Sequence, residues 1–124
     1  MRKLVIVFSG LLLMGCKNKK DDNYGQPPKA NATETVSGQE LFEGKGTCTA
    51  CHLPDQKVIG PSLTEIAKTY KEKKGSIVSF LKEESDPIVD PDQYETMKTN
   101  FAITKKMSEE ELKALEEYIL TFSK

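Results

Sequence analysis

Apolar side chains recur at helical spacing in four segments of the chain after residue 37. In the first segment Leu41 and Phe42 supply the apolar side, and Gly44 and Gly46 should end the helix. The second runs from about Ser62 to Gly75, with apolar positions at Leu63, Ile66, Ala67 and Tyr70. A short third helix starts at Ser76, with one apolar face made by Ile77, Phe80 and Leu81. The last segment has the clearest stripe, made by Leu112, Leu115, Ile119 and Phe122.

Polar residues and prolines mark where these helices begin and end. Ser37 and Glu40 form an S-x-x-E capping box. Ser108 is the expected cap of the last helix, whose positive N-terminal end is favoured by the acidic residues 109–111. Asp86-Pro87 and Asp90-Pro91 interrupt regular structure, so we expect a long loop through about Ile103. No stretch alternates like a strand, and the prediction is an all-α domain over residues 37–124.

The first 36 residues follow a different pattern. Met-Arg-Lys precedes a mostly apolar run from Leu4 to Met14, which is about half the ~20 apolar residues that a spanning helix needs. Leu13-Met14-Gly15-Cys16 resembles the cleavage and lipidation motif of bacterial lipoproteins, although Met is unusual before the Gly. We therefore expect a signal peptide over residues 1–15 and a lipid on Cys16. Residues 16–36 have almost no large apolar residue and are expected to be a disordered tether.

The composition of the chain indicates how large a core it can form and which partners its charge favours. The chain has 124 residues and no Trp, so a domain of this size has a thin core that a large apolar cofactor would help to fill. Removal of Arg2 and Lys3 with the signal peptide leaves 16 basic residues (18 − 2) against 19 acidic, a net charge of −3. This mild charge does not indicate a nucleic-acid partner, and no small-molecule substrate is evident from the sequence.

The candidate chemistry lies in Cys48-Thr49-Ala50-Cys51-His52. Two thiols separated by two residues can each add to one vinyl group of the same porphyrin, and the adjacent imidazole can then bind the iron. Such attachment takes place outside the cytoplasm, where the signal peptide would direct the chain. Lipidation of Cys16 would account for the odd number of cysteines.

Three other interpretations of this motif account for it less completely. A zinc site needs four ligands, and the domain offers two Cys and a single His unless carboxylates complete the set. A thioredoxin-like redox pair needs a strand–helix setting, whereas the neighbouring segments are helical or loops. A structural disulfide would leave His52 without a role.

From about Val36 to Phe122 the sequence resembles the class I monohaem cytochromes c. The resemblance implies about four helices wrapped around one covalently bound haem c. It places Gly38 and Phe42 of the first helix against an aromatic residue of the last, for which Tyr118 is suited. It also implies that the carbonyl of Pro61 accepts a hydrogen bond from His52 and fixes the orientation of the ring.

The resemblance further implies a distal iron ligand in the irregular loop before the last helix. Met97 lies there, and Met97-Lys98-Thr99-Asn100 has the Met-x-x-Asn form in which the Asn amide bonds the ligating sulfur. Met107 directly precedes the Ser108 cap and is expected to pack as a hydrophobic staple. The alternatives are Met107 as the ligand, or an iron with an open or solvent-bound position.

The predicted function is one-electron transfer by a carrier, not an enzyme, anchored by lipid to a bacterial membrane and facing the periplasm, or alternatively the cell surface. Its expected partners are redox proteins that donate and accept electrons. Two alternatives remain: a haem-bearing subunit of a larger oxidoreductase, or a haem sensor or catalyst with an open iron position. Four lysines are candidates for the haem rim, although an ordinary solvated surface is the simpler interpretation: Lys45, Lys57, Lys105 and Lys106.

Overall fold

The computed structural model describes residues 37–123, and all of the regular structure in that range is helical. Five α-helices and two 3₁₀ turns follow one another in the order α1 (Gly38–Glu43), η1 (Cys48–Ala50), α2 (Leu63–Lys73), α3 (Ile77–Leu81), η2 (Pro91–Gln93), α4 (Tyr94–Thr104) and α5 (Glu109–Leu120). The all-α prediction is confirmed. The signal peptide, Cys16 and the tether lie outside the described residues.

Serine caps fix the starts of four helices. The hydroxyls of Ser37, Ser62, Ser76 and Ser108 each accept a hydrogen bond from the backbone N–H three residues later. Only the last forms a full capping box, because the Glu111 side chain also accepts from the Ser108 N–H. At Ser37 only one half of the predicted box is present.

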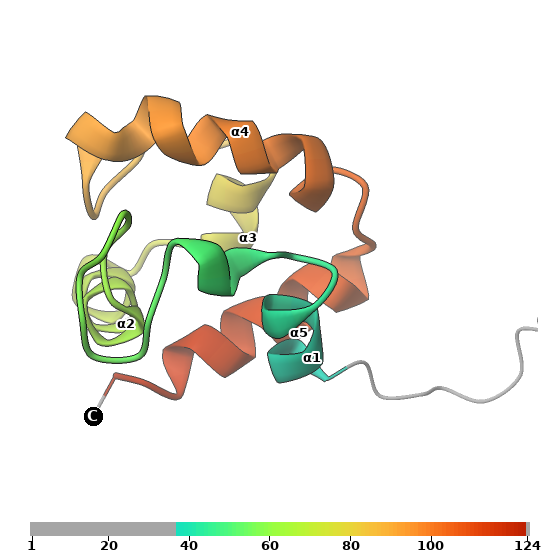
Figure 1. The fold of residues 1–124 in the computed structure, drawn as a ribbon, viewed down its shortest axis with the longest axis horizontal. Helices are drawn as coiled ribbons and strands as arrows, with labels where there is room; N and C mark the ends of the chain where they lie inside the picture. Colours follow the sequence, from blue (N-terminus) through green and yellow to red (C-terminus); the bar gives the residue numbers. More distant parts are fainter. Residues whose placement is uncertain (1–36, 124) are drawn as a thin grey trace, which may run out of the picture. The chain divides into compact units, whose positions relative to one another are not determined.

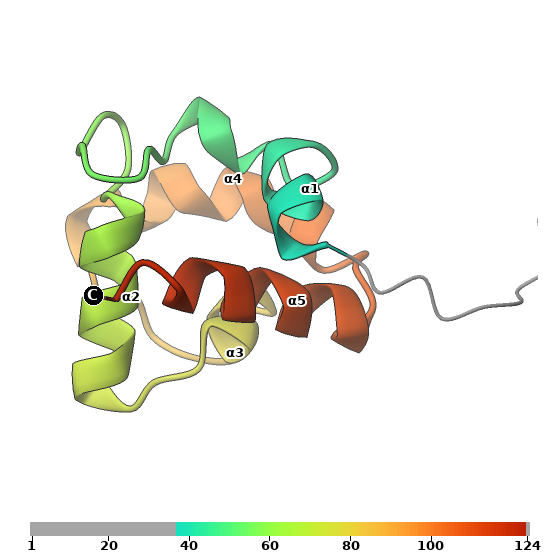
Figure 2. The ribbon, with the colours of Figure 1, turned by 90° about the horizontal axis from the view of Figure 1, so that it is seen from below.

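Helix α5 is the centre of the packing, and it contacts α1, α2 and α3 (Figures 1 and 2). Three residues of its predicted stripe are buried, with Leu112 2%, Leu115 1% and Ile119 7% exposed, whereas Phe122 lies just beyond the helix and is half-buried. Gly38 of α1 lies so close to α5 that a Cβ there would be 2.0 Å from the carbonyl oxygen of Ala114. The rings of Phe42 and Tyr118 pack with centroids 5.6 Å apart, as the sequence resemblance implied.

The segment expected to be a loop through Ile103 contains a helix, and that prediction is wrong. Pro91 starts the turn η2, which continues directly into α4 over Tyr94–Thr104. Proline is compatible with the first turn of a helix, where its missing N–H would have no partner. In Figure 1 α4 lies on the opposite side of the drawn domain from α1 and α5. Its C-terminal end is held on α3 by the buried Thr104 hydroxyl, which donates to the carbonyl of Leu81 at 2.7 Å.

No helix within residues 37–123 is both long and apolar enough to cross a membrane.

Candidate functional site

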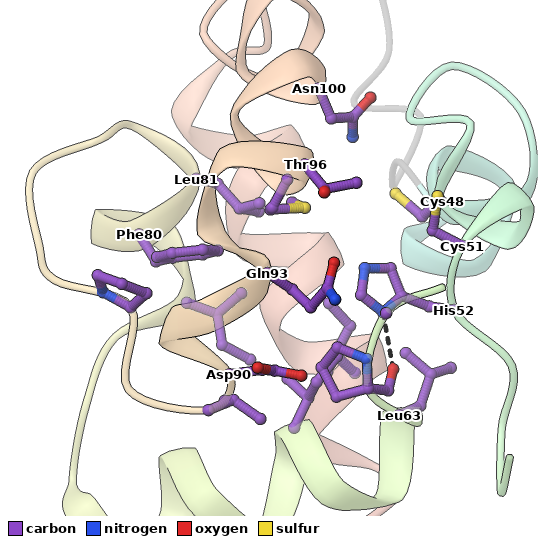
Figure 3. A pocket seen from close by; sticks show the side chains of 18 of the residues that line it. Cys48, Cys51, His52, Leu63, Phe80, Leu81, Asp90, Gln93, Thr96 and Asn100 are labelled. Atoms are coloured by element: carbon purple, nitrogen blue, oxygen red, sulfur yellow. Dashed lines mark hydrogen bonds between the residues drawn. The ribbon is translucent and has the colours of Figure 1, made fainter. Parts of the chain in front are cut away.

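The two cysteines lie on the turn η1 and its C-cap, and they are not bonded to each other. The backbone N–H groups of Cys51 and His52 both donate to the carbonyl of Cys48, which closes the turn. Figure 3 shows both thiols and the His52 ring facing one cavity. Burial raises the pKa of the Cys48 thiol to about 11, so this thiol keeps its proton at neutral pH.

A hydrogen bond and a close contact fix the orientation of the His52 ring. Its Nδ1 lies 2.7 Å from the carbonyl oxygen of Pro61, the hydrogen bond that the resemblance implied (Figure 3). A carbonyl can only accept, so Nδ1 carries the hydrogen and Nε2 is left with a lone pair. Gly60 packs flat against the ring, because a Cβ there would be 2.4 Å from Cε1 of His52.

The cavity has a volume of about 260 Å³, just below the roughly 300–1,000 Å³ usual for small-molecule sites. The wall opposite His52 comes from α3, the 87–90 segment and α4. Most of its side chains are apolar, and they include Phe80, Leu81, Ile88, Val89 and Met97.

Met97 lies on this wall, on α4 rather than in a loop as predicted. Its side chain is partly buried and packs at the edge of the core. Met107 lies elsewhere: it is 8% exposed, belongs to the core cluster and is not among the cavity residues. This packing agrees with the staple role expected of Met107.

Asn100 also lines the cavity, one helical turn after Met97. Its Nδ2 donates to the carbonyl of Gly46 at 3.2 Å, and its Oδ1 accepts from the Thr47 hydroxyl at 3.4 Å. The sequence resemblance implied a bond from Asn100 to the methionine sulfur, and within residues 37–123 the amide has these other partners instead.

At the other end of the cavity lies Asp90, which sequence reasoning did not select. Its carboxylate accepts from Lys57 at 2.6 Å, and Figure 3 shows Asp90 and Asn100 toward opposite ends of the cavity. This bond raises the pKa of Lys57. No signal in a single sequence marks Asp90, because its pairing with residue 57 depends on the fold.

Two more of the lysines that were candidates for the haem rim form ion pairs, Lys45 with Glu111 and Lys105 with Glu83.

These residues fit a haem. The cavity is walled by apolar side chains, the thiol pair lies at one side, and His52 presents a lone pair with its other nitrogen already bonded. The absence of a Cβ at Gly60 leaves room for the imidazole in this orientation. The zinc alternative finds no support, because residues 37–123 contain no group of three or more His, Cys, Asp or Glu side chains suited to a metal ion.

Comparison with known proteins agrees with this fit. Residues 35–123 match the family model described as cytochrome c. Cytochrome c-551 of Azotobacter vinelandii is 44% identical over 39 residues, which are 32% of this chain and 46% of that protein. Cytochrome c-551 of Pseudomonas denitrificans is 44% identical over 34 residues, 27% of this chain and 40% of that protein. The matched stretches therefore span less than half the length of these relatives.

The family match covers most of the chain and contains the thiol pair, the histidine and the cavity between them. The chain therefore belongs to the cytochrome c family, in the class I monohaem form, and carries one covalently bound haem c.

Proposed function

We propose that this protein transfers single electrons, with Cys48 and Cys51 attached to the haem and with His52 and Met97 as the axial ligands of its iron. The observation that carries the proposal is that His52 and Met97 line one cavity from different elements, whereas Met107 is buried in the core. When bound, the haem iron supplies the one-electron redox couple.

The chain's own residues fix the ligands and exclude water. The Pro61 carbonyl orients His52 and directs its free nitrogen toward the iron position. The apolar wall around Met97 lowers the polarity next to the iron site. A thioether ligand raises the reduction potential above that of a site with two nitrogen ligands.

Electron transfer requires protein partners, and the segment after His52 offers a contact surface for them. Leu53, Val58 and Ile59 are 37%, 56% and 50% exposed, the large apolar side chains that the domain leaves in solvent within residues 37–123. Ile59 also lines the cavity. Redox partners use small, transient interfaces, and three apolar side chains beside the site suit such an interface.

The proposal also places the domain at a bacterial membrane, facing the periplasm. Its support is in the sequence: the lipoprotein-like motif ending in Cys16, followed by polar residues 17–36. Labelling with a radioactive fatty acid, compared between wild type and Cys16→Ser, tests this part alone.

A redox titration of the haem-loaded protein with visible spectra tests the iron site. We expect a single one-electron transition and, in the oxidised protein, the weak band near the red end of the spectrum that marks sulfur bonded to iron(III). Met97→Ala should abolish this band, and Met107→Ala, the matched control, should keep it although it destabilises the core by about 2–5 kcal/mol. Loss of the band in Met107→Ala alone would overturn the assignment, and rapid binding of carbon monoxide by the ferrous wild type would favour an open iron site.

A further inference from the structure

Helix α4 carries Met97 and is held on two sides. On one side it packs on α3, where the Thr104 hydroxyl donates to Leu81 and the rings of Phe101 and Tyr94 lie 5.4 and 6.3 Å from that of Phe80. On the side facing the cysteines, Asn100 makes the hydrogen bonds that join α4 to residues 46–52, and no other residue of α4 does so in the described part of the chain.

The acceptor of the Asn100 amide is a buried carbonyl. Gly46 is buried, and its oxygen accepts from Asn100 Nδ2 at 3.2 Å and from the Cys48 thiol at 3.4 Å. The reversed amide orientation would direct Oδ1 at this carbonyl, and two acceptors would then face each other. A buried carbonyl without a donor is costly, so the orientation of Asn100 is determined by Gly46.

We propose that Asn100 is a positioning residue, which holds the Met97-bearing helix against the haem-attachment segment through the carbonyl of Gly46. This inference rests on the proposed function, in which Met97 binds the iron. Asn100 follows Met97 by three residues and therefore lies on the same face of α4, so a fixed Asn100 also fixes how far the Met97 thioether lies from His52.

Attachment of the haem would remove one of the two side-chain donors to this carbonyl. When Cys48 forms its thioether, its S–H bond breaks, an S–C bond forms to one vinyl carbon, and the hydrogen goes to the other vinyl carbon; no oxidant is consumed. Cys48 can then no longer donate to Gly46, and Asn100 is left as the side-chain donor to that carbonyl. Loss of the Asn100 contact would then leave the buried carbonyl without a side-chain donor, so the contact would matter most after attachment.

The backbone of Thr47 supports the same role. Thr47 has φ 52°, a left-handed conformation that a β-branched residue rarely adopts. In this conformation its hydroxyl lies 3.4 Å from Asn100 Oδ1. Strained residues of this kind persist where the surrounding structure holds them, and they gather at functional sites.

The test uses haem-loaded protein and four variants. Asn100→Ala removes both contacts, and Thr47→Gly removes the hydroxyl while relieving the left-handed strain, which keeps the fold intact. Thr47→Ser restores the hydroxyl. Lys98→Gln, on the exposed side of the same helix, is the matched control, because its side chain pairs with Glu95 and lies over the Tyr94 ring, both within α4.

We expect amide hydrogen exchange in α4 to accelerate about tenfold in Asn100→Ala relative to α2, with a similar acceleration of carbon monoxide binding by the ferrous protein. Thr47→Gly should accelerate both rates less than Asn100→Ala does. Thr47→Ser, which keeps a hydroxyl, should return both rates toward wild type, and Lys98→Gln should match wild type.

Unchanged exchange of α4 in Asn100→Ala would overturn the proposal. So would a loss of the sulfur–iron band in Asn100→Ala with no effect of Thr47→Gly, because that result assigns Asn100 to the Met97 sulfur. Absence of the band in wild type would instead contradict the proposed function, and the exchange of α4 still tests the contact with Gly46.

Discussion

Gly60 lies directly against the imidazole of His52, and a Cβ at residue 60 would be 2.4 Å from Cε1 and 2.8 Å from Nδ1 of the ring. The methyl group would meet a ring that the Pro61 carbonyl already holds at 2.7 Å. The ring and the added methyl group cannot both keep these positions, so residue 60 controls the orientation of His52.

We therefore expect Gly60→Ala to rotate His52 away from Pro61 and to weaken its bond to iron, with a shift of the visible spectrum toward a high-spin form. Gly75→Ala is the matched control. A Cβ there meets Ile88 Cδ1 at 2.8 Å and Tyr70 Cδ1 at 3.0 Å, of which the first is the end of a flexible side chain that can move. A wild-type spectrum in Gly60→Ala would contradict this account.

The close contact between α1 and α5 predicts that a side chain at residue 38 lowers the stability of the fold. In Gly38→Ala the new methyl group would lie 2.0 Å from the Ala114 carbonyl oxygen and 2.7 Å from Tyr118 Cβ. The helices must separate, which should lower the free energy of unfolding by about 1–3 kcal/mol. Denaturant unfolding measures the loss, and Gln39→Ala, an exposed neighbour on α1, should cost much less.

The side chain of Glu116, a residue of α5, caps the N-terminus of α3. Its Oε1 accepts from the Ser76 hydroxyl at 3.2 Å and from the N–H groups of Ile77 at 2.7 Å and Val78 at 3.3 Å. Glu116→Ala leaves these donors without their acceptor and should cost about 0.5–2 kcal/mol, as the loss of a helix cap does. Thermal unfolding should rank Glu116→Gln, which keeps an acceptor oxygen, between Glu116→Ala and wild type. Equal losses in Glu116→Ala and in the exposed Glu117→Ala would refute the capping role.

The pairing of Lys45 with Glu111 predicts a pH dependence. The hydrogen bond from Lys45, followed by that from the Ser108 backbone, lowers the pKa of Glu111 below its usual 4.5. A carboxylate with a lowered pKa in the folded state contributes stability above its ordinary pKa and loses this contribution as the pH falls through the lowered value.

Lys45→Ala should therefore be less stable than wild type at neutral pH, and the difference should shrink below about pH 4.5. High salt should also reduce the difference, because Lys45 lies in solvent and its attraction to Glu111 is screened there. Urea unfolding at several pH values measures it, with Lys68→Ala, an exposed lysine of α2, as the control. A difference that is the same at acid and neutral pH would show that the pair contributes nothing.

The exposed apolar segment predicts an effect on electron exchange without an effect on the haem. Val58 is 56% exposed and does not line the cavity. A charge there must be desolvated when two proteins meet, so Val58→Asp should slow electron self-exchange about fivefold, the effect of roughly 1 kcal/mol. Line broadening in mixtures of oxidised and reduced protein measures the rate. Ala102→Asp, which places the same charge on the exposed side of α4, should have the smaller effect.

Local signals predicted much of the fold. The caps at Ser37 and Ser108, the helix starts near Ser62 and Ser76 and the buried residues of α5 are short-range patterns, and each appears in the structure at the expected residues. Helix α4 was missed because its buried positions are few. Phe101 and Thr104 are buried, whereas much of the rest of α4 lies against the cavity or in solvent and carries polar residues. The two Pro residues before it suggested a break, although Pro91 in fact starts the helical run.

The partners of Asn100 and Asp90 could not be predicted in the same way. Asn100 bonds residues 54 and 53 positions away, and Asp90 pairs with a lysine 33 positions away. Such contacts depend on how the helices pack, and an amide or a carboxylate in a polar stretch has no pattern that specifies a distant partner.

The packing of Gly38 on Ala114 and Tyr118 also limits the order in which the domain can fold. Helices α1 and α5 stand at the two ends of the described chain, so their contact closes a loop that contains the other helices and the haem motif. The core cannot close until the C-terminal helix has packed on α1. Cys48, Cys51 and His52 lie within this loop, so they stay accessible for haem attachment until α5 closes the core.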